Sequence, residues 1–528
     1  MFHDEMIPVE GKAVRRPPNL LLLVIGLLAC SGEKPVAAND AAAIADSIDR
    51  HIKLRLDTAG LSRGAPSDDA EFLRRVFLDL HGVVPPAERA RRFLDSDDDR
   101  KRIELIDELL ASPRFGEHFA DLWRGRLISP LASEQRLESQ RFAGWLADRF
   151  NRNDGWNRVV YDLLTAAGKA DENPAVSYLI EGRYPLSVTD LTDLSSRYFL
   201  GVRLNCAQCH DHPFAEWKRQ DYWAMAAFFA QIQTPGRPKV VYLAGVQDDP
   251  KMTLASVQNT DAIDGFQSQP PTFPGGKKLQ AHGDATLRAS LAQWITSAEN
   301  PYFARATVNR MWWHFFGRGI VNPVDDMHTG NPPSHPELLE ELARRFAESG
   351  FDLKRLCRAM VMSHTYQQTS RLAEQADAEA QLFARMPIKV LTAAQLYDSL
   401  VQILGPPGKT PSIDARRSAR YEFCQFFTSD GDPDPTRYER GIPHLLRLMN
   451  SPQFAGRNIA ALVARIAGPA RSPEETVDEL FLAILARYPT ATERKLVEEQ
   501  LSRGDGPHGA YRELAWALLM SSEFSLNH

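Results

Sequence analysis

Cysteine is scarce in this chain, with 5 residues among 528. So few thiols exclude a small fold stapled by disulfides, and stability must come from the burial of apolar side chains. Hydrophobic residues make up 43% of the chain, which is ample for two domains. Basic residues are not in excess, because 62 Lys and Arg stand against 68 Asp and Glu, for a net charge of −6. The chain therefore lacks the basic footprint of a nucleic-acid-binding protein.

A long hydrophobic run is missing too. The run at residues 20–29 has about ten residues, and a bilayer-spanning helix needs roughly 20. Lys12, Arg15 and Arg16 precede this run and Cys30 follows it, an order typical of a bacterial export signal that ends in a lipobox. We predict an export signal over residues 1–30, with lipidation of Cys30 and a location in the periplasm or cell envelope. The alternative is an ordinary cleaved signal with an incidental cysteine.

The remaining pattern is mostly helical. Apolar residues between Phe72 and Leu80 recur on one helix face, and similar stripes continue to the C-terminus. Residues 233–285 differ, because proline and glycine are frequent there. We predict a mainly α fold of two helical domains, joined by an irregular, Pro/Gly-rich, partly β insert. The predicted segments are a tether over 31–46, one domain over 47–232, the insert over 233–285 and a second domain over 286–528.

Some helix ends are also predicted. Ser472 precedes Pro473 and stands three residues before Glu475, which is the pattern of a capping box. Asp326 and Ser334 are expected to cap helices as well. The alternative for the stretch from Asp325 to His328 is acid–base work or cation binding by carboxylate and imidazole. Asn309, Arg310 and His314 are expected to share either a buried polar network or a catalytic role.

The signature with the most chemical content is Cys206-Ala207-Gln208-Cys209-His210. This C-x-x-C-H pattern is typical of c-type haem attachment, in which two thiols form thioethers and the histidine ligates iron. The opposite iron ligand would come from elsewhere, and the candidates are His314, His364, Met311, Met327 and His328. Six nearby aromatic residues could wall a haem edge or simply pack in the core: Phe214, Trp217, Tyr222, Trp223, Phe228 and Phe229. Nucleophile-elbow, P-loop and H-E-x-x-H signatures are absent.

Two other interpretations of the motif stay open. Cys206, Cys209, His210 and His212 could bind zinc or another transition metal without haem, although adjacent Cys209 and His210 point in different directions. Alternatively, the two cysteines form a short disulfide or stay reduced, and the histidines only stabilise the loop. Cys357 and Cys424 are isolated and expected to be buried apolar groups.

Longer stretches resemble a known pair of families. Residues 197–214 and 74–82 resemble the planctomycete-type cytochrome-like family, domain of unknown function 1549. Residues 308–319, 333–339 and 363–366 resemble its usual companion, domain of unknown function 1553. The resemblance implies an exported, mainly helical protein of suspected cytochrome character, without an established reaction. Some relatives carry a further N-terminal cytochrome-like domain, which we do not expect here because the sequence has one C-x-x-C-H motif.

Three functions follow from these hypotheses. The first is electron transfer through one covalent haem c to an unknown redox partner protein in the envelope. The second is an envelope enzyme or binding protein that uses a Cys/His-bound transition metal on extracellular polymers. The third is a non-catalytic scaffold. All three share the membrane anchor at Cys30 and the absence of a nucleic-acid partner.

Overall fold

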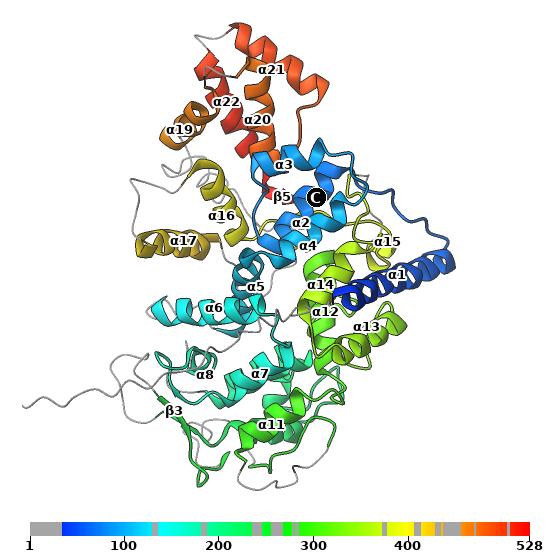
Figure 1. The fold of residues 1–528 in the computed structure, drawn as a ribbon. Helices are drawn as coiled ribbons and strands as arrows, with labels where there is room; N and C mark the ends of the chain where they lie inside the picture. Colours follow the sequence, from blue (N-terminus) through cyan, green and yellow to red (C-terminus); the bar gives the residue numbers. More distant parts are fainter. Residues whose placement is uncertain are drawn as a thin grey trace, which may run out of the picture.

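The computed structural model describes residues 34–128, 136–180, 187–234, 245–254, 268–276, 279, 285–371, 377–405, 413–427, 435–436, 456–468, 471–503 and 507–528. Over this part of the chain it has 63% helix, 4% strand and 22 helices (Figure 1). The predicted mainly α class is confirmed. Among the described residues, no helix combines the length and apolar character that crossing a membrane requires.

The N-terminal part is an array of helices. Their ends follow local capping rules: Asp68 Oδ1 accepts a hydrogen bond from Glu71 N at 2.8 Å to begin α2, and Gly82 with φ +70° ends it. The helices are α1 (Lys34–Ala59), α2 (Asp69–His81), α3 (Ala87–Leu94), α4 (Lys101–Ala111), α5 (Pro113–Leu127), α6 (Arg136–Asn151), α7 (Trp156–Thr165), α8 (Ser177–Ile180), α9 (Val188–Ser195) and α10 (Arg219–Ala226).

The predicted tether is replaced in part by α1. Ala41, Ile44 and Ala45 are buried on this helix, and the stripe continues through Ile48 and Ile52. These residues recur every three or four positions, which is the spacing of one helix face. The helix contacts α13 and α14, whose bounds follow below (Figure 1). The small residues of this stretch therefore allow close helix packing instead of forming a linker.

The strands are short and lie mostly beside the predicted insert. An antiparallel sheet has the order β1-β3-β2, formed by β1 (Gly168–Lys169), β2 (Ile232–Gln233) and β3 (Gly245–Asp248). Ile232 pairs with Asp248, and Gly168 pairs with Val246. The expectation of a partly β segment in the middle of the chain is confirmed.

Helices resume after the insert, as expected. They are α11 (Leu287–Ile295), α12 (Phe303–Phe316), α13 (Pro336–Glu348), α14 (Leu353–Met362), α15 (Asp377–Gln381), α16 (Ala393–Leu404), α17 (Ile413–Phe427), α19 (Arg457–Ile466), α20 (Pro473–Leu485), α21 (Ala491–Arg503), α22 (Pro507–Leu519) and α23 (Ser522–Ser525). The remaining strands, β4 (Lys389–Val390) and β5 (Leu526–Asn527), pair antiparallel.

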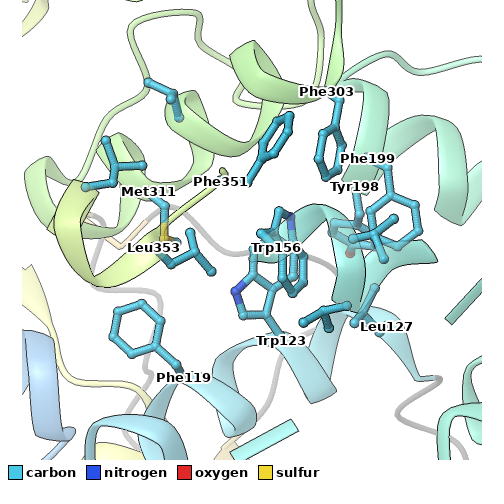
Figure 2. Packing of buried hydrophobic residues seen from close by; sticks show 14 of the residues in the cluster. Phe119, Trp123, Leu127, Trp156, Tyr198, Phe199, Phe303, Met311, Phe351 and Leu353 are labelled. Carbon is cyan, nitrogen blue, oxygen red and sulfur yellow. The ribbon is translucent and has the colours of Figure 1, made fainter. Parts of the chain in front are cut away.

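The main apolar core unites residues from both sides of the insert. Trp123 of α5 lies against Trp156 of α7, with ring centroids 4.3 Å apart. Phe303, Met311 and Leu353, from beyond the insert, face the same cluster (Figure 2). A second cluster consists mainly of residues 391–524. Among the described residues, the clusters therefore divide near residue 390, whereas the predicted domain boundaries lie at 233–285.

Buried polar side chains connect α2 to the C-terminal residues. The carboxylate of Asp79 accepts hydrogen bonds from Lys389 Nζ at 2.7 Å, Asn527 Nδ2 at 2.7 Å and the Tyr366 hydroxyl at 2.8 Å. Arg74 donates to backbone carbonyls of α20 and α23, including Ile484 O at 3.2 Å and Phe524 O at 2.7 Å. The family-like stretch 74–82 thus has a structural role in closing the fold.

Candidate functional site

The C-x-x-C-H motif lies on the surface in a single short turn. Residues Asn205–Gln208 form a 3₁₀ helix, η4, and Cys209 and His210 follow it directly. Cys206, Cys209 and His210 are all exposed. Both thiols are free, so the disulfide alternative does not describe this state of the chain. All three groups predicted to bind the cofactor are therefore accessible from solvent.

The turn is anchored to the core behind it. The Trp223 indole Nε1 of α10 donates to Gln208 O at 3.1 Å, and Trp223 itself is buried. Asp211 Oδ1 accepts from Arg219 N at 2.9 Å, which fixes the start of α10 to the motif. Ala207, between the two cysteines, is fully buried. The motif is thus an exposed turn on a fixed base.

Backbone contact assigns a role to each ring nitrogen of His210. Its Nδ1 lies 2.8 Å from Asp211 O, and because a carbonyl only accepts, Nδ1 is the donor in this contact. The lone pair of the neutral imidazole is then on Nε2. A metal-ligating histidine typically has this arrangement, with the second nitrogen hydrogen-bonded to a carbonyl.

His212 is arranged differently. Its Nδ1 accepts hydrogen bonds from Phe214 N at 3.2 Å and Ala215 N at 3.0 Å. Burial, together with the neighbouring His328 and His210, lowers the pKa of His212 against an opposing effect of Asp326. His212 therefore favours the neutral form and uses one nitrogen to hold the loop.

The metal hypothesis gains no geometric support. Within the described ranges, no group of three or more His, Cys, Asp and Glu side chains is arranged to hold a metal ion. Of the two predicted histidine ligands, His212 uses its Nδ1 to accept from backbone N–H groups, whereas the Nδ1 contact of His210 leaves the lone pair on Nε2. Cys30 lies outside the described residues.

The candidates for a second iron ligand lie in different parts of the fold. His314 and Met311 lie within α12, and His314 Nε2 donates to Asp79 O at 2.9 Å. His328 instead lies beside the motif, with its ring centroid 6.5 Å from that of His212. Met327 of the same loop lies against Gly201: its backbone N donates to Gly201 O at 2.9 Å, and a Cβ at Gly201 would lie 3.1 Å from Met327 Sδ. The loop that carries Met327 and His328 is thus a candidate segment that lies beside the motif.

Five of the six nearby aromatic residues belong to the core. Trp217, Tyr222, Trp223, Phe228 and Phe229 are buried, so the interpretation as core packing is confirmed for them. Phe214 is different, with 80% of its surface exposed, the highest value among the large hydrophobic side chains described. A single exposed aromatic side chain is common on protein surfaces, so Phe214 by itself does not indicate a binding site.

The other polar clusters have structural explanations. Asn309 exchanges hydrogen bonds with Val321 and also donates to Val324 O at 2.9 Å, so the predicted buried network is confirmed for it. Ser334 does not cap α13: the N-cap is His335, without a side-chain cap, and Ser334 Oγ instead donates to Ile320 O at 3.1 Å. No helix begins at Asp326, whose carboxylate lies 3.8 Å from His328 Nε2.

Two features were missed by sequence reasoning. Burial, with a smaller contribution from Asp190, raises the pKa of Asp193 to about 7, although a hydrogen bond from Tyr222 opposes the shift. The second is the pairing of fully buried Asp325 with Arg197, Arg203 and Arg310, although Arg310 itself was expected in a buried polar network. The only local signal was the pair of arginines in 197–203, directly before the motif.

Comparisons with known proteins agree with the resemblance. Residues 47–234 match the family PSCyt2, described as a protein of unknown function (DUF1549). Residues 287–422 match the family PSD1, described as a protein of unknown function (DUF1553). The assignment of one family to each half of the chain is confirmed. No curated protein and no solved structure matches the chain.

Proposed function

On the premise that the chain combines a PSCyt2 segment with a PSD1 segment, we propose that it is an exported electron-transfer protein with one c-type haem. The observation that carries this proposal is the motif turn, in which Cys206, Cys209 and His210 are exposed together and neither thiol is used by the fold. Haem attachment requires both thiols to be reduced and accessible at this spacing.

The residues present fit the group. Cys206 and Cys209 would form the thioethers, and His210 would ligate iron through Nε2, because its Nδ1 is turned to Asp211 O. Phe214 offers an exposed apolar surface beside the turn. When bound, the haem supplies one-electron redox chemistry, and the chain supplies its tether, its ligand and a fixed scaffold. The protein would serve a partner redox enzyme in the cell envelope, held to the membrane through Cys30.

The metal and scaffold functions are weaker proposals. A zinc or copper site needs a convergent donor set, and the described residues offer none of three or more groups. A scaffold leaves the exposed thiol pair without a role. The haem proposal uses all of these features together.

The test is a visible spectrum of the full chain produced in a bacterial host with haem-attachment machinery. We expect a reduced-minus-oxidised haem band that remains with the polypeptide after denaturation, because thioethers are covalent. Cys206→Ser combined with Cys209→Ser abolishes retention, whereas Cys424→Ser, a matched change away from the motif, leaves it unchanged.

A colourless product with both motif thiols alkylatable, or joined to each other, would contradict the proposal. Stoichiometric zinc or copper in that product would favour the metal function instead. Cys30→Ser tests the anchor separately, since it is expected to move the protein from the membrane to the soluble fraction without changing the spectrum.

A further inference from the structure

A buried lysine and a buried asparagine lie opposite each other on β4 and β5. Lys389 pairs with Asn527 in the antiparallel register of these strands, and the two residues are 5% and 3% exposed. Directly opposite residues of such a pair project to the same face of the sheet. The carboxylate of Asp79 on α2 contacts both side chains. We propose that Lys389 and Asn527 become joined by an intramolecular isopeptide bond, with Asp79 as the group that transfers the proton.

One oxygen atom brings the two reacting groups together. Asp79 Oδ1 accepts a hydrogen bond from Lys389 Nζ at 2.7 Å and another from Asn527 Nδ2 at 2.7 Å. The two nitrogens are therefore no further apart than twice this distance, and the amide carbon Cγ is bonded to Nδ2. Nζ also donates to the backbone carbonyls of His314 and Phe315, each at 3.0 Å. These contacts hold the amine beside the amide, and such positioning accelerates a reaction between two groups.

Burial prepares Lys389 to act as a nucleophile. An amine attacks only in its neutral form, and a lysine is activated when it is removed from water. Burial lowers the pKa of Lys389, although the Asp79 carboxylate opposes the shift. Asp79 is itself 1% exposed, so it is placed to accept the lysine proton directly. The neutral amine is therefore more accessible here than in a lysine on the surface.

The Asn527 amide is incompletely paired. Its Nδ2 donates to Asp79, but among the described residues its buried Oδ1 has no hydrogen-bond partner. Buried polar side-chain atoms mostly have such a partner in folded proteins, so each exception needs an explanation. The cluster holds this amide by Nδ2, which is the atom that the proposed reaction removes.

The reaction exchanges one carbon–nitrogen bond for another. Asp79 Oδ1 takes a proton from Lys389 Nζ, and the neutral amine attacks Cγ of Asn527. The new bond joins Nζ to Cγ, and the bond between Cγ and Nδ2 breaks. Of the three protons on the lysine ammonium, one stays in the new amide, one departs with Nδ2 as part of ammonia, and one remains on Asp79. The atoms balance without an oxidant or a cofactor, so the proposal does not depend on haem.

The bond would close a long covalent loop. Lys389 lies in the PSD1 segment and Asn527 lies beyond it, and the second apolar cluster consists mainly of residues between them. A cross-link of this kind restricts the unfolded chain, as a disulfide does. It therefore stabilises the C-terminal helices in a chain that has few cysteines.

Peptide mass spectrometry on the folded full chain tests the proposal. In an unlinked chain, trypsin cleaves after Lys389 and after Arg512, so residues 513–528 form a separate peptide. We expect instead a branched peptide in which residues 513–528 are joined to the segment that contains Lys389, with no cleavage after this lysine. Its mass is expected to be lower than that of the two unlinked segments by about 17 Da, the mass of one ammonia.

Lys389→Arg is the informative variant, because a guanidinium keeps the positive charge but is not deprotonated to a nucleophile. We expect complete loss of the branched peptide with an unchanged circular dichroism spectrum, and Asn527→Ala, which removes the amide, is expected to give the same loss. Lys354→Arg is the matched control: this lysine is partly buried and donates to Asn151 O at 3.3 Å, and its replacement leaves the branched peptide in place.

Two separate, unmodified peptides from the folded wild-type chain would overturn the proposal, and so would a branched peptide that persists in the Lys389→Arg variant. Haem attachment is read from the visible spectrum. A colourless chain that contains the branched peptide therefore contradicts the electron-transfer function alone.

Discussion

Asp193 is a carboxyl group whose environment opposes its charge. Its raised pKa of about 7 means that the folded state holds a proton that the unfolded state releases near pH 4. The unfolded state therefore becomes relatively more favourable as pH rises from about 4 to 7, and the full cost applies above pH 7. We predict that Asp193→Asn raises the melting temperature at pH 8 by about 1–3 °C, with a smaller gain at pH 4.

Thermal unfolding at both pH values checks this prediction. Asp190→Asn is the matched control, because Asp190 is exposed on the same helix, and it is expected to change the melting temperature less. An equal gain at pH 4 and pH 8 would show that the effect of the Asp193 change is not electrostatic.

For single residues, the sequence predicted which side chains could carry chemistry better than it predicted their burial and contacts. The spacing of Cys206, Cys209 and His210 is local, so the motif could be recognised without a structure. The burial of Trp223 and the exposure of Phe214 depend on how α10 packs, and no local pattern separates the two. The arginines around Asp325 converge from segments more than 100 residues apart, which sequence spacing does not encode.

Among the elements, α2 connects distant parts of the chain through buried polar side chains. Arg74 is 1% exposed and donates to carbonyls of Ile484, Glu523, Phe524 and Leu526. We predict that Arg74→Met destabilises the protein by about 3 kcal/mol or more, because several buried carbonyls lose their donor at about 1–3 kcal/mol each. Urea unfolding measures the loss, and hydrogen exchange is expected to rise first in α23 and β5.

Arg100→Met serves as the control for that change. Arg100 is exposed and its guanidinium lies 4.0 Å from Glu104, too long for a strong ion pair, so the same substitution is expected to cost less than about 0.5 kcal/mol. Faster exchange spread evenly over the chain in the Arg74 variant would contradict a specific role in holding the C-terminal elements.

Prediction of the elements succeeded where the signal was local. The capping box at α20 is confirmed: Ser472 Oγ accepts from Glu475 N at 3.1 Å, and Ser472 N donates to Glu475 Oε2 at 2.7 Å. The cap expected at Ser334 was wrong, because its hydroxyl serves the distant carbonyl of Ile320. The helix α1 was not predicted over the segment expected to be a tether. Small residues are compatible both with a linker and with a closely packed helix face, so composition did not separate the two.

For the whole molecule, buried neutral histidines govern the response to acid. Burial, reinforced by His314, lowers the pKa of His118 to about 3, and burial lowers that of His81 to about 4. The unfolded state binds protons near pH 6.5 and the folded state does not, so stability is complete above pH 6.5 and falls steadily toward pH 4. We predict a melting temperature that decreases over this window.

His118→Gln checks the cause. Between pH 6.5 and 4, the slope of the unfolding free energy against pH is expected to become less steep by about 1 kcal/mol per pH unit. The reason is that the variant no longer has the His118 imidazole, whose pKa is lowered in the folded state. His364→Gln, at an exposed site, is the comparison. An unchanged slope in the His118 variant would assign the acid response to other groups.

The overall architecture was predicted only in part. The mainly helical class could be predicted from the periodicity of apolar residues, and the partly β segment in the middle of the chain from its proline and glycine content. That Trp123 and Met311 share one core could not be predicted, because the apolar face of a helix does not specify which helix it packs against. Whether the predicted domains fold independently therefore depends on contacts that cross the insert.

The buried site of Asp79 has a consequence for biosynthesis. Its partner Asn527 is 448 positions later in the chain. At roughly 5–20 residues per second, the ribosome takes roughly 20–90 seconds to make the residues between them. Until Asn527 has emerged, the Asp79 carboxylate lacks one of its three donors and the packing around α2 stays incomplete. Such delayed closure suits a polypeptide that must thread through a translocation channel before it compacts, as the proposed export demands.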